Sequence, residues 1–242
     1  MRRLAILAAL AALSACTDPY PQTGFPQPGP APGAAPGAAP DAQTAARNFV
    51  SVVTRMEPLA ESECRARTDG TNCDFRIVVD DRPGQPPNAF QTLDQAGRPV
   101  IAFTIPLIAE ARNTDELAFI MGHEASHHIL SHIPRQQQTA MTGALILGGL
   151  AAASGGDAAA VRRAQNIGAS VGARSYSKDF ELEADELGTE IALDAGYDPV
   201  LGAAFFSRIP DPGNRFLGTH PPNAARIGVV RATVARLRGG GV

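Results

Sequence analysis

The segment MGHEASHHILSH, from Met121 to His132, contains four of the five histidines in the 242-residue chain. If the segment forms a helix, His123 and His127 point to the same side because they are four residues apart, and Glu124 lies beside them. Two imidazoles and a carboxylate in this HExxH pattern are typical of a zinc site in which the glutamate acts as a general base. The alternative is a pair of core histidines whose nitrogens are satisfied by carbonyl groups.

The other two histidines of the segment are predicted to lie away from such a site. On a helix of 3.6 residues per turn, His128 lies about 100° round from His127, and His132 is roughly half a turn from His123. We therefore expect His128 and His132 to be solvated or packed side chains rather than ligands.

A helix carrying the motif is indicated by its ends and by an apolar stripe. Asn113 is a suitable N-cap with Glu116 three residues later, and Pro134 is expected to end the helix. The stripe consists of Leu117, Ile120, Met121, Ala125, Ile129 and Ile133. The polar motif would thus lie within a core-facing helix, where a bound cation removes the cost of burying it.

A third ligand is needed, because a zinc hydrolase usually has three protein ligands and keeps one position for water. Leu130 and Ile133 occupy the positions where the metzincin motif has Gly and His, which excludes that class. The segment SKDFELEADELG offers Glu181 and Asp185 on one helix face, whereas Glu183 points away. One acid would bind the metal and the other would accept a hydrogen bond from a ligand histidine. Taken alone, such an acidic face is ordinarily just solvated.

HEASH, ELEAD some fifty residues later, PNAF upstream and THPPNAARI downstream together resemble a known family. It is the gluzincin metallopeptidase family that includes HtpX and the CaaX prenyl endopeptidase, and the closer similarity is to its periplasmic lipoprotein members without transmembrane helices. The similarity extends from about Ala42 to the C-terminus. It implies an α+β, mainly helical zincin-like domain with an HExxH helix, a second acidic ligand helix, a small antiparallel sheet and one zinc ion per chain.

The resemblance also implies roles for the matched residues. His123, His127 and Glu181 would bind the zinc ion. Glu124 would be the catalytic glutamate, and Asp185 would support a ligand histidine from behind.

His220 matches a histidine near the C-terminus of the family, which contacts the active site or occupies the open zinc position at rest. We therefore count His220 with Glu124 among the catalytic residues, and His220 and Tyr176 are candidate donors to the oxyanion. One departure is visible: the family usually has Ser-Arg before the acidic motif, whereas this chain has Ser177 and Lys178. Any bidentate contact of that arginine would be missing here.

Strands are predicted ahead of the HExxH helix, in FRIVV, NAFQTL and PVIAFT, with a turn from Asp94 to Gly97. Asn88, Ala89 and Phe90 match a segment of the family. As an edge strand beside the metal, this segment would hold an extended peptide by main-chain pairing. An ordinary hairpin without a substrate role is the alternative.

The apolar segment MTGALILGGLAAASGG follows the HExxH helix and is shorter than the roughly twenty residues that a membrane helix needs. In polytopic members of the family, the corresponding region spans the membrane. We predict that residues 141–153 form a buried helix or a mobile lid over the cleft, with membrane insertion as the alternative.

Residues 1–15 are predicted to be a lipoprotein signal peptide, because Arg2 and Arg3 precede an apolar run that is too short to span a bilayer. The run ends in LSAC, which resembles the bacterial lipobox and would leave Cys16 as a lipidated N-terminus that anchors the chain to a membrane. Thr17 after the cysteine favours the inner leaflet of the outer membrane by resemblance to sorting signals. A non-lipidated secretory signal is the alternative.

Residues 16–41 form a Pro/Gly/Ala-rich tether that cannot bury a core, and the folded domain is expected to comprise residues 42–242. With Cys16 used as the anchor, Cys64 and Cys73 remain as an even pair outside the cytosol, which predicts a disulfide. Metal binding by these two alone would lack close-spaced partners. The net charge of −3 gives no indication of a nucleic-acid partner.

The sequence and the resemblance together predict a zinc-dependent metalloendopeptidase with protein or peptide substrates, and the resemblance implies unfolded or misassembled cell-envelope proteins. Glu124 would take a proton from the attacking water and deliver it to the leaving amine. One alternative is an envelope lipoprotein that acts as a chaperone-like binding module with a structural or plugged zinc site. Another is a hydrolase of peptidoglycan cross-links.

Overall fold

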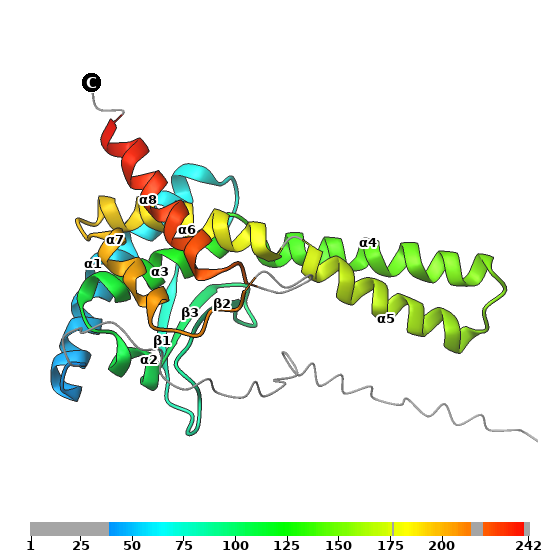
Figure 1. The fold of residues 1–242 in the computed structure, drawn as a ribbon, viewed down its shortest axis with the longest axis horizontal. Coiled ribbons are helices and arrows are strands. Elements are labelled where there is room, and N and C mark those ends of the chain that lie inside the picture. The colour runs from blue at the N-terminus through cyan, green and yellow to red at the C-terminus, as the bar shows by residue number, and fades with distance from the viewer. Residues whose placement is uncertain (1–38, 176, 214–219, 240–242) are drawn as a thin grey trace, which may run out of the picture. The chain divides into compact units, whose positions relative to one another are not determined.

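A computed structural model of the chain describes residues 39–175, 177–213 and 220–239. The described part is mainly helical with one three-stranded sheet (Figure 1), which confirms the predicted α+β fold class. The signal peptide predicted at residues 1–15, the lipidation site Cys16 and most of the tether at residues 16–41 lie outside the described residues. The elements in chain order are α1 (Ala42–Arg67), β1 (Arg76–Asp80), β2 (Ala89–Leu93), β3 (Pro99–Thr104), α2 (Ile105–Glu110), α3 (Thr114–Ile129), α4 (His132–Ala153), α5 (Ala158–Ser175), α6 (Ser177–Asp194), α7 (Pro199–Gly202), the 3₁₀-helix η1 (Ala203–Ser207) and α8 (Asn223–Gly239).

Helix α1 begins after Asp41, whose side chain accepts a hydrogen bond from the Thr44 amide and so caps the helix. Its buried face packs against α3 and joins the main hydrophobic core. Near its end, Cys64 is joined by a disulfide to Cys73, and the two Cα atoms are 5.6 Å apart. The bridge ties the end of α1 to the segment that leads into β1.

The sheet has the strand order β1-β3-β2. Strands β2 and β3 form the predicted antiparallel hairpin, closed by a turn in which the Gly97 amide donates to the Asp94 carbonyl. Strand β1, however, pairs with β3 in parallel, so the sheet is mixed and not wholly antiparallel as predicted. Burial accounts for the central place of β3: the strand is buried along its whole length, and this position pairs its backbone on both sides.

Helix α3 carries the HExxH motif and begins as predicted, because the Asn113 side chain accepts a hydrogen bond from the Glu116 amide. Its end differs from the prediction. The helix stops at Ile129, Ser131 adopts a left-handed backbone with φ of 56°, and Pro134 lies in the first turn of α4. A proline is tolerated there because the first amides of a helix have no intrahelical acceptor. The chain therefore turns immediately after the motif.

Helices α4 and α5 form an antiparallel pair whose contacts are mostly with one another (Figure 1). The prediction that residues 141–153 form a buried helix is wrong: the segment is helical, but its large side chains are exposed, with Leu145 at 68%. Glycines cause this arrangement, since the backbones approach so closely where Gly143 faces Gly168 that a Cβ atom on either would overlap the other. The lid function stays a prediction. None of the helices among the described residues is both long and apolar enough to cross a bilayer.

A buried ion pair joins the start of α3 to the segment after η1. The Glu116 carboxylate accepts two hydrogen bonds from the Arg208 guanidinium, of 2.7 and 2.6 Å, and a third from the Arg112 amide. The Glu116 side chain is almost wholly buried. Removing one partner of such a pair leaves an uncompensated charge in the interior.

We predict that Arg208→Ala lowers the free energy of unfolding by about 3–5 kcal/mol, because Glu116 stays buried without its cation. Arg236→Ala is the matched control: it also removes an ion-paired arginine, one that contacts the carboxylates of Glu186 and Glu190, but its side chain is half exposed. That variant should change stability far less, because exposed ion pairs are screened by water. Urea unfolding followed by circular dichroism measures both. An equal loss of unfolding free energy in the two variants would show that the buried pair contributes no more than the exposed one.

Candidate metal centre

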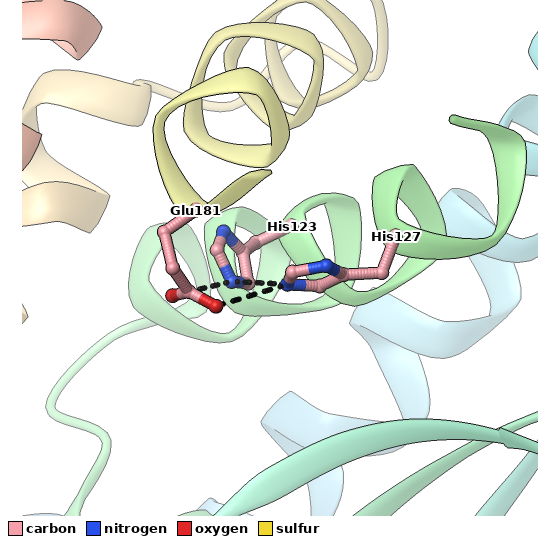
Figure 2. A group of neighbouring side chains, drawn as sticks. All are labelled: His123, His127 and Glu181. Carbon is pink, nitrogen blue, oxygen red and sulfur yellow. Dashed lines mark hydrogen bonds and ion pairs between the residues drawn. The ribbon is translucent and has the colours of Figure 1, made fainter. Parts of the chain in front are cut away.

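Three side chains converge between α3 and α6 (Figure 2). The Nε2 atoms of His123 and His127 are 3.0 Å apart on one face of α3. The Glu181 carboxylate reaches in from α6, with Oε2 3.6 Å from His123 Nε2 and Oε1 3.6 Å from His127 Nε2. The three residues predicted to bind the metal are therefore brought together.

The spacing of these atoms matches what a zinc ion requires. Tetrahedral coordination with bonds of about 2.0–2.2 Å places neighbouring ligand atoms roughly 3.4 Å apart. The three observed separations, 3.0, 3.6 and 3.6 Å, lie close to this value. The set of two imidazoles and one carboxylate is also one that catalytic zinc sites use. The residues present thus fit the ion.

The two helices can supply these ligands because their backbones touch. A Cβ atom on Gly122 would lie 2.8 Å from the Gly188 carbonyl oxygen, and one on Gly188 would lie 2.7 Å from the His123 amide nitrogen. Gly188 is seven residues after Glu181, which places both on the same face of α6. The close approach therefore brings the Glu181 carboxylate within reach of both imidazoles.

Asp185 supports His123 from behind, in the place predicted for it. Its Oδ1 lies 2.9 Å from His123 Nδ1, so that this nitrogen donates and Nε2 is left for the metal. Asp185 is fully buried, and the Arg226 guanidinium compensates its charge with two hydrogen bonds of 2.6 and 2.7 Å. Arg226 also lies 3.9 Å above the ring of Phe206.

Sequence reasoning missed Arg226. The residue is part of the THPPNAARI segment, which carried the family resemblance without a role for its arginine. It lies on the buried side of α8 with Asn223, Val230, Thr233 and Val234, and a single arginine on such a face is a signal that it has a buried partner. Since Asp185 lies 41 residues away in the sequence, spacing alone gives no indication of the pairing.

The other two histidines of the motif segment take different positions. His128 is packed as expected, with Nε2 2.7 Å from the Asn72 carbonyl oxygen and its ring edge against Phe75. His132 is buried, and it contacts His127 of the candidate metal site, with the two Nδ1 atoms 2.8 Å apart. The expectation that it lies half a turn away assumed one continuous helix. The break after Ile129 returns His132 to the site.

Comparison with known proteins agrees with this geometry. The sequence profile of Peptidase family M48 matches residues 47–234, which is more than half of the chain. The chain belongs to Peptidase family M48. Peptidases of this family are metal-dependent, and His123, His127 and Glu181 form the candidate metal site of this M48 domain.

A curated relative named "Putative beta-barrel assembly-enhancing protease", from Vibrio cholerae serotype O1, is 30% identical over 132 residues. The match covers 50% of this chain and 26% of the relative. The M48 chain thus aligns with about a quarter of that protein's length.

The charges of the site hold its ligands in metal-binding forms. Burial, reinforced by the charge of His123, lowers the pKa of His127 to about 3, so this imidazole keeps a free nitrogen lone pair at neutral pH. Burial alone would raise the pKa of Glu181, but the hydrogen bond from His220 and the charges of His123 and Arg226 hold it well below its usual range. Glu181 is therefore a carboxylate throughout the physiological range.

Glu124 lies on the same helix and is almost fully buried. Burial raises the pKa of its carboxyl group, and the nearby Glu181 charge acts in the same direction. Such a shift suits a general base, which must take up a proton during the reaction. Helix α3, which carries Glu124, packs against β2.

The segment predicted to bind substrate lies at this edge of the sheet. In the described part of the chain, β2 pairs only with β3. The Thr104 amide donates to the Asn88 carbonyl, so Asn88 and Phe90 face β3, while Ala89 and Gln91 turn their main-chain groups toward the unpaired edge. Gln91 was not among the predicted residues. Of the predicted Asn88, Ala89 and Phe90, only Ala89 turns its main-chain groups to the open edge, and their role in binding substrate stays a prediction.

His220 reaches the centre from the segment before α8. Its Nδ1 lies 3.1 Å from Glu181 Oε2, while its side chain is 55% exposed. His220 thus contacts the carboxylate of the candidate metal site, and its catalytic role stays a prediction. Tyr176, the other candidate oxyanion donor, lies outside the described residues.

We predict that Gly188→Ala weakens zinc binding, because the added methyl group would push α6 away from α3 and separate Glu181 from the two histidines. Gly228→Ala is the matched control, since nothing lies within 4 Å of a Cβ atom there. The control should bind zinc normally and gain up to about 1 kcal/mol of helix stability. Competition with a chromogenic chelator measures the affinity. Unchanged affinity in Gly188→Ala would show that the close contact does not position the ligands.

Proposed function

We propose that this M48 chain is a zinc-dependent metalloendopeptidase that hydrolyses peptide bonds of unfolded or misassembled cell-envelope proteins. The observation that carries the proposal is the convergence of His123, His127 and Glu181 at zinc-ligand spacing, with Glu124 buried beside them. The name of the Vibrio cholerae relative, a protease that enhances beta-barrel assembly, supports an envelope substrate.

The zinc ion would be held by His123, His127 and Glu181, and when bound it would polarise the scissile carbonyl and acidify a water molecule. Glu124 takes the proton of the attacking water and gives it to the leaving amine. Burial prepares Glu124 for this exchange, because it raises the affinity of the carboxylate for a proton. The Asp185 hydrogen bond keeps the His123 ring oriented throughout.

An extended peptide would lie along β2. Ala89 and Gln91 direct main-chain groups to the open edge, where pairing with a substrate backbone needs no particular side chain. This mode of binding supports broad sequence tolerance, which suits unfolded proteins as substrates. Strand β2 packs against α3, so a peptide paired at this edge would lie near the helix that carries the base.

One observation favours a second candidate, a chaperone-like binding module with a plugged site. His220 already contacts the ligand Glu181, and an imidazole at that position is able to occupy the coordination site that a water molecule needs. The presence of Glu124 beside the metal ligands favours the peptidase, since a binding module has no use for a general base.

We predict that Glu124→Gln retains zinc but cuts unfolded casein at least about 100-fold more slowly, because the general base is gone while the three ligands remain. Zinc content by atomic absorption and casein cleavage are measured on the same samples. Near-normal cleavage would eliminate Glu124 as the base.

His220→Ala, assayed alongside, separates the two candidates. If the wild type and His220→Ala both cut, the site is an open peptidase. If only His220→Ala cuts, His220 plugs the site at rest. If neither the wild type nor His220→Ala cuts casein although both hold zinc, the chaperone-like binding module becomes the favoured function.

We further propose that the chain is a periplasmic lipoprotein anchored through Cys16 to the inner leaflet of the outer membrane. The LSAC sequence before the tether supports lipidation, and two or more acyl chains give stable anchoring.

We predict that Cys16→Ser releases the protein from membranes into the soluble periplasmic fraction, because the acyl chains that hold it would no longer be attached. Fractionation of a Gram-negative host that expresses either form measures the shift. Detergent-dependent extraction of the serine variant would contradict the anchor.

A further inference from the structure

We infer that His132, held in place by Glu183 and Arg135, positions the metal-binding imidazole of His127 through a hydrogen bond to its Nδ1 atom. This inference rests on the proposed metal site. It assigns a positioning role to three residues that lie outside the metal ligands and the general base.

The hydrogen bonds run in one direction. The Nε2 atom of His127 faces His123 and Glu181, so for metal binding this nitrogen must keep its lone pair, and Nδ1 must carry the proton. His127 Nδ1 then donates to His132 Nδ1 at 2.8 Å. The remaining nitrogen of His132, Nε2, donates in turn to Glu183 Oε2 at 3.2 Å.

Glu183 is fixed at the other end of this chain. Its two oxygens accept hydrogen bonds from Arg135, of 2.6 Å at Oε2 and 3.3 Å at Oε1. The carboxylate therefore stays charged and oriented, and it is a strong acceptor for the His132 N–H group. Each of the hydrogen bonds that link His127, His132, Glu183 and Arg135 thus has a defined donor and acceptor.

Packing restricts the His132 ring to one orientation. The side chain is 4% exposed, and its ring stacks on Phe180 with 4.6 Å between centroids and 10° between planes. The Arg135 guanidinium lies 4.2 Å from the centroid of the same Phe180 ring. Phe180 therefore aligns both the histidine and the arginine that serve Glu183.

The partners of His127 resemble those of His123, the other histidine of the candidate metal site. His123 is backed directly by Asp185, which is paired with Arg226. His127 is backed by a carboxylate and an arginine as well, but with an imidazole inserted between. The insertion follows from helix geometry: Glu183 is two residues from Glu181 and so projects from another side of α6, and the His132 ring spans the gap.

Local backbone geometry also supports a selected position for His132. Ser131 is the one residue other than glycine with a positive φ in the described part of the chain. This conformation is uncommon for serine, and it reverses the chain so that His132 follows α3 yet faces His127.

The test compares zinc affinity in the purified full-length chain and in two substitutions of His132. His132→Phe keeps the stacked ring but removes both hydrogen bonds, and we expect it to raise the zinc dissociation constant by about 10–100-fold. His132→Gln keeps an acceptor and a donor, and it should recover most of the affinity. The visible spectrum of the cobalt-substituted protein should change in His132→Phe and return toward wild type in His132→Gln.

His128→Phe is the matched control, because His128 is a neighbouring histidine that contacts Asn72 and Phe75 away from the metal ligands. Its zinc affinity should equal that of the wild type. The melting temperature of each metal-free variant shows whether the domain is folded. Wild-type affinity in His132→Phe, or equal loss in the phenylalanine and glutamine variants, would overturn the inference.

A second variant covers the case in which His132→Phe does not fold. Glu183→Ala leaves the His132 ring in place and removes its acceptor, and it should weaken zinc binding by a smaller factor. Full affinity in this variant would also overturn the inference. Absence of zinc from the wild type would instead contradict the proposed function, so the two failures are distinguishable.

Discussion

The contact between the backbones of α3 and α6, where Gly122 faces Gly188, is the constraint on which the site depends. Each helix supplies only part of the centre: α3 brings two imidazoles and the general base, and α6 brings a carboxylate ligand. At an ordinary helix separation, with side chains between them, Glu181 would not reach both histidines. The absence of two Cβ atoms therefore sets the ligand spacing, and the hydrophobic core around α1 and α3 holds the helices at that distance.

Around this contact, charge is compensated in layers. Carboxylates face the metal ligands, and arginines face the carboxylates, so that Asp185 is paired with Arg226 and Glu183 with Arg135. Removal from water makes each isolated charge unfavourable, but it also strengthens each hydrogen bond within the network. The M48 domain thus obtains oriented, lone-pair-bearing imidazoles from partners on three helices, α4, α6 and α8.

Whether a feature of the fold or the site could be predicted depends on how far apart in the sequence its residues lie. The His123–His127 pair, the Glu181–Asp185 pair and the Asn113 cap each rest on a spacing of three or four residues along one helix, which local periodicity records directly. The joining of the two pairs into one site was implied by the family resemblance. Arg226 and the parallel pairing of β1 with β3 depend on contacts between distant segments, which periodicity does not contain. His132 was misjudged because a single left-handed residue, Ser131, invalidated the assumption of a continuous helix. The exposure of Leu145 escaped prediction because an apolar segment normally implies burial.

Helix α6 and the α4–α5 pair differ in how much change of length they tolerate. Glu181, Glu183 and Asp185 each meet a different partner, so one residue inserted before them would rotate all three by about 100° and dismantle the centre in a single step. The α4–α5 pair contacts mostly itself, and whole turns added symmetrically near residues 154–157 would lengthen it without displacing a ligand. The tip of this pair therefore tolerates a change of length that α6 does not.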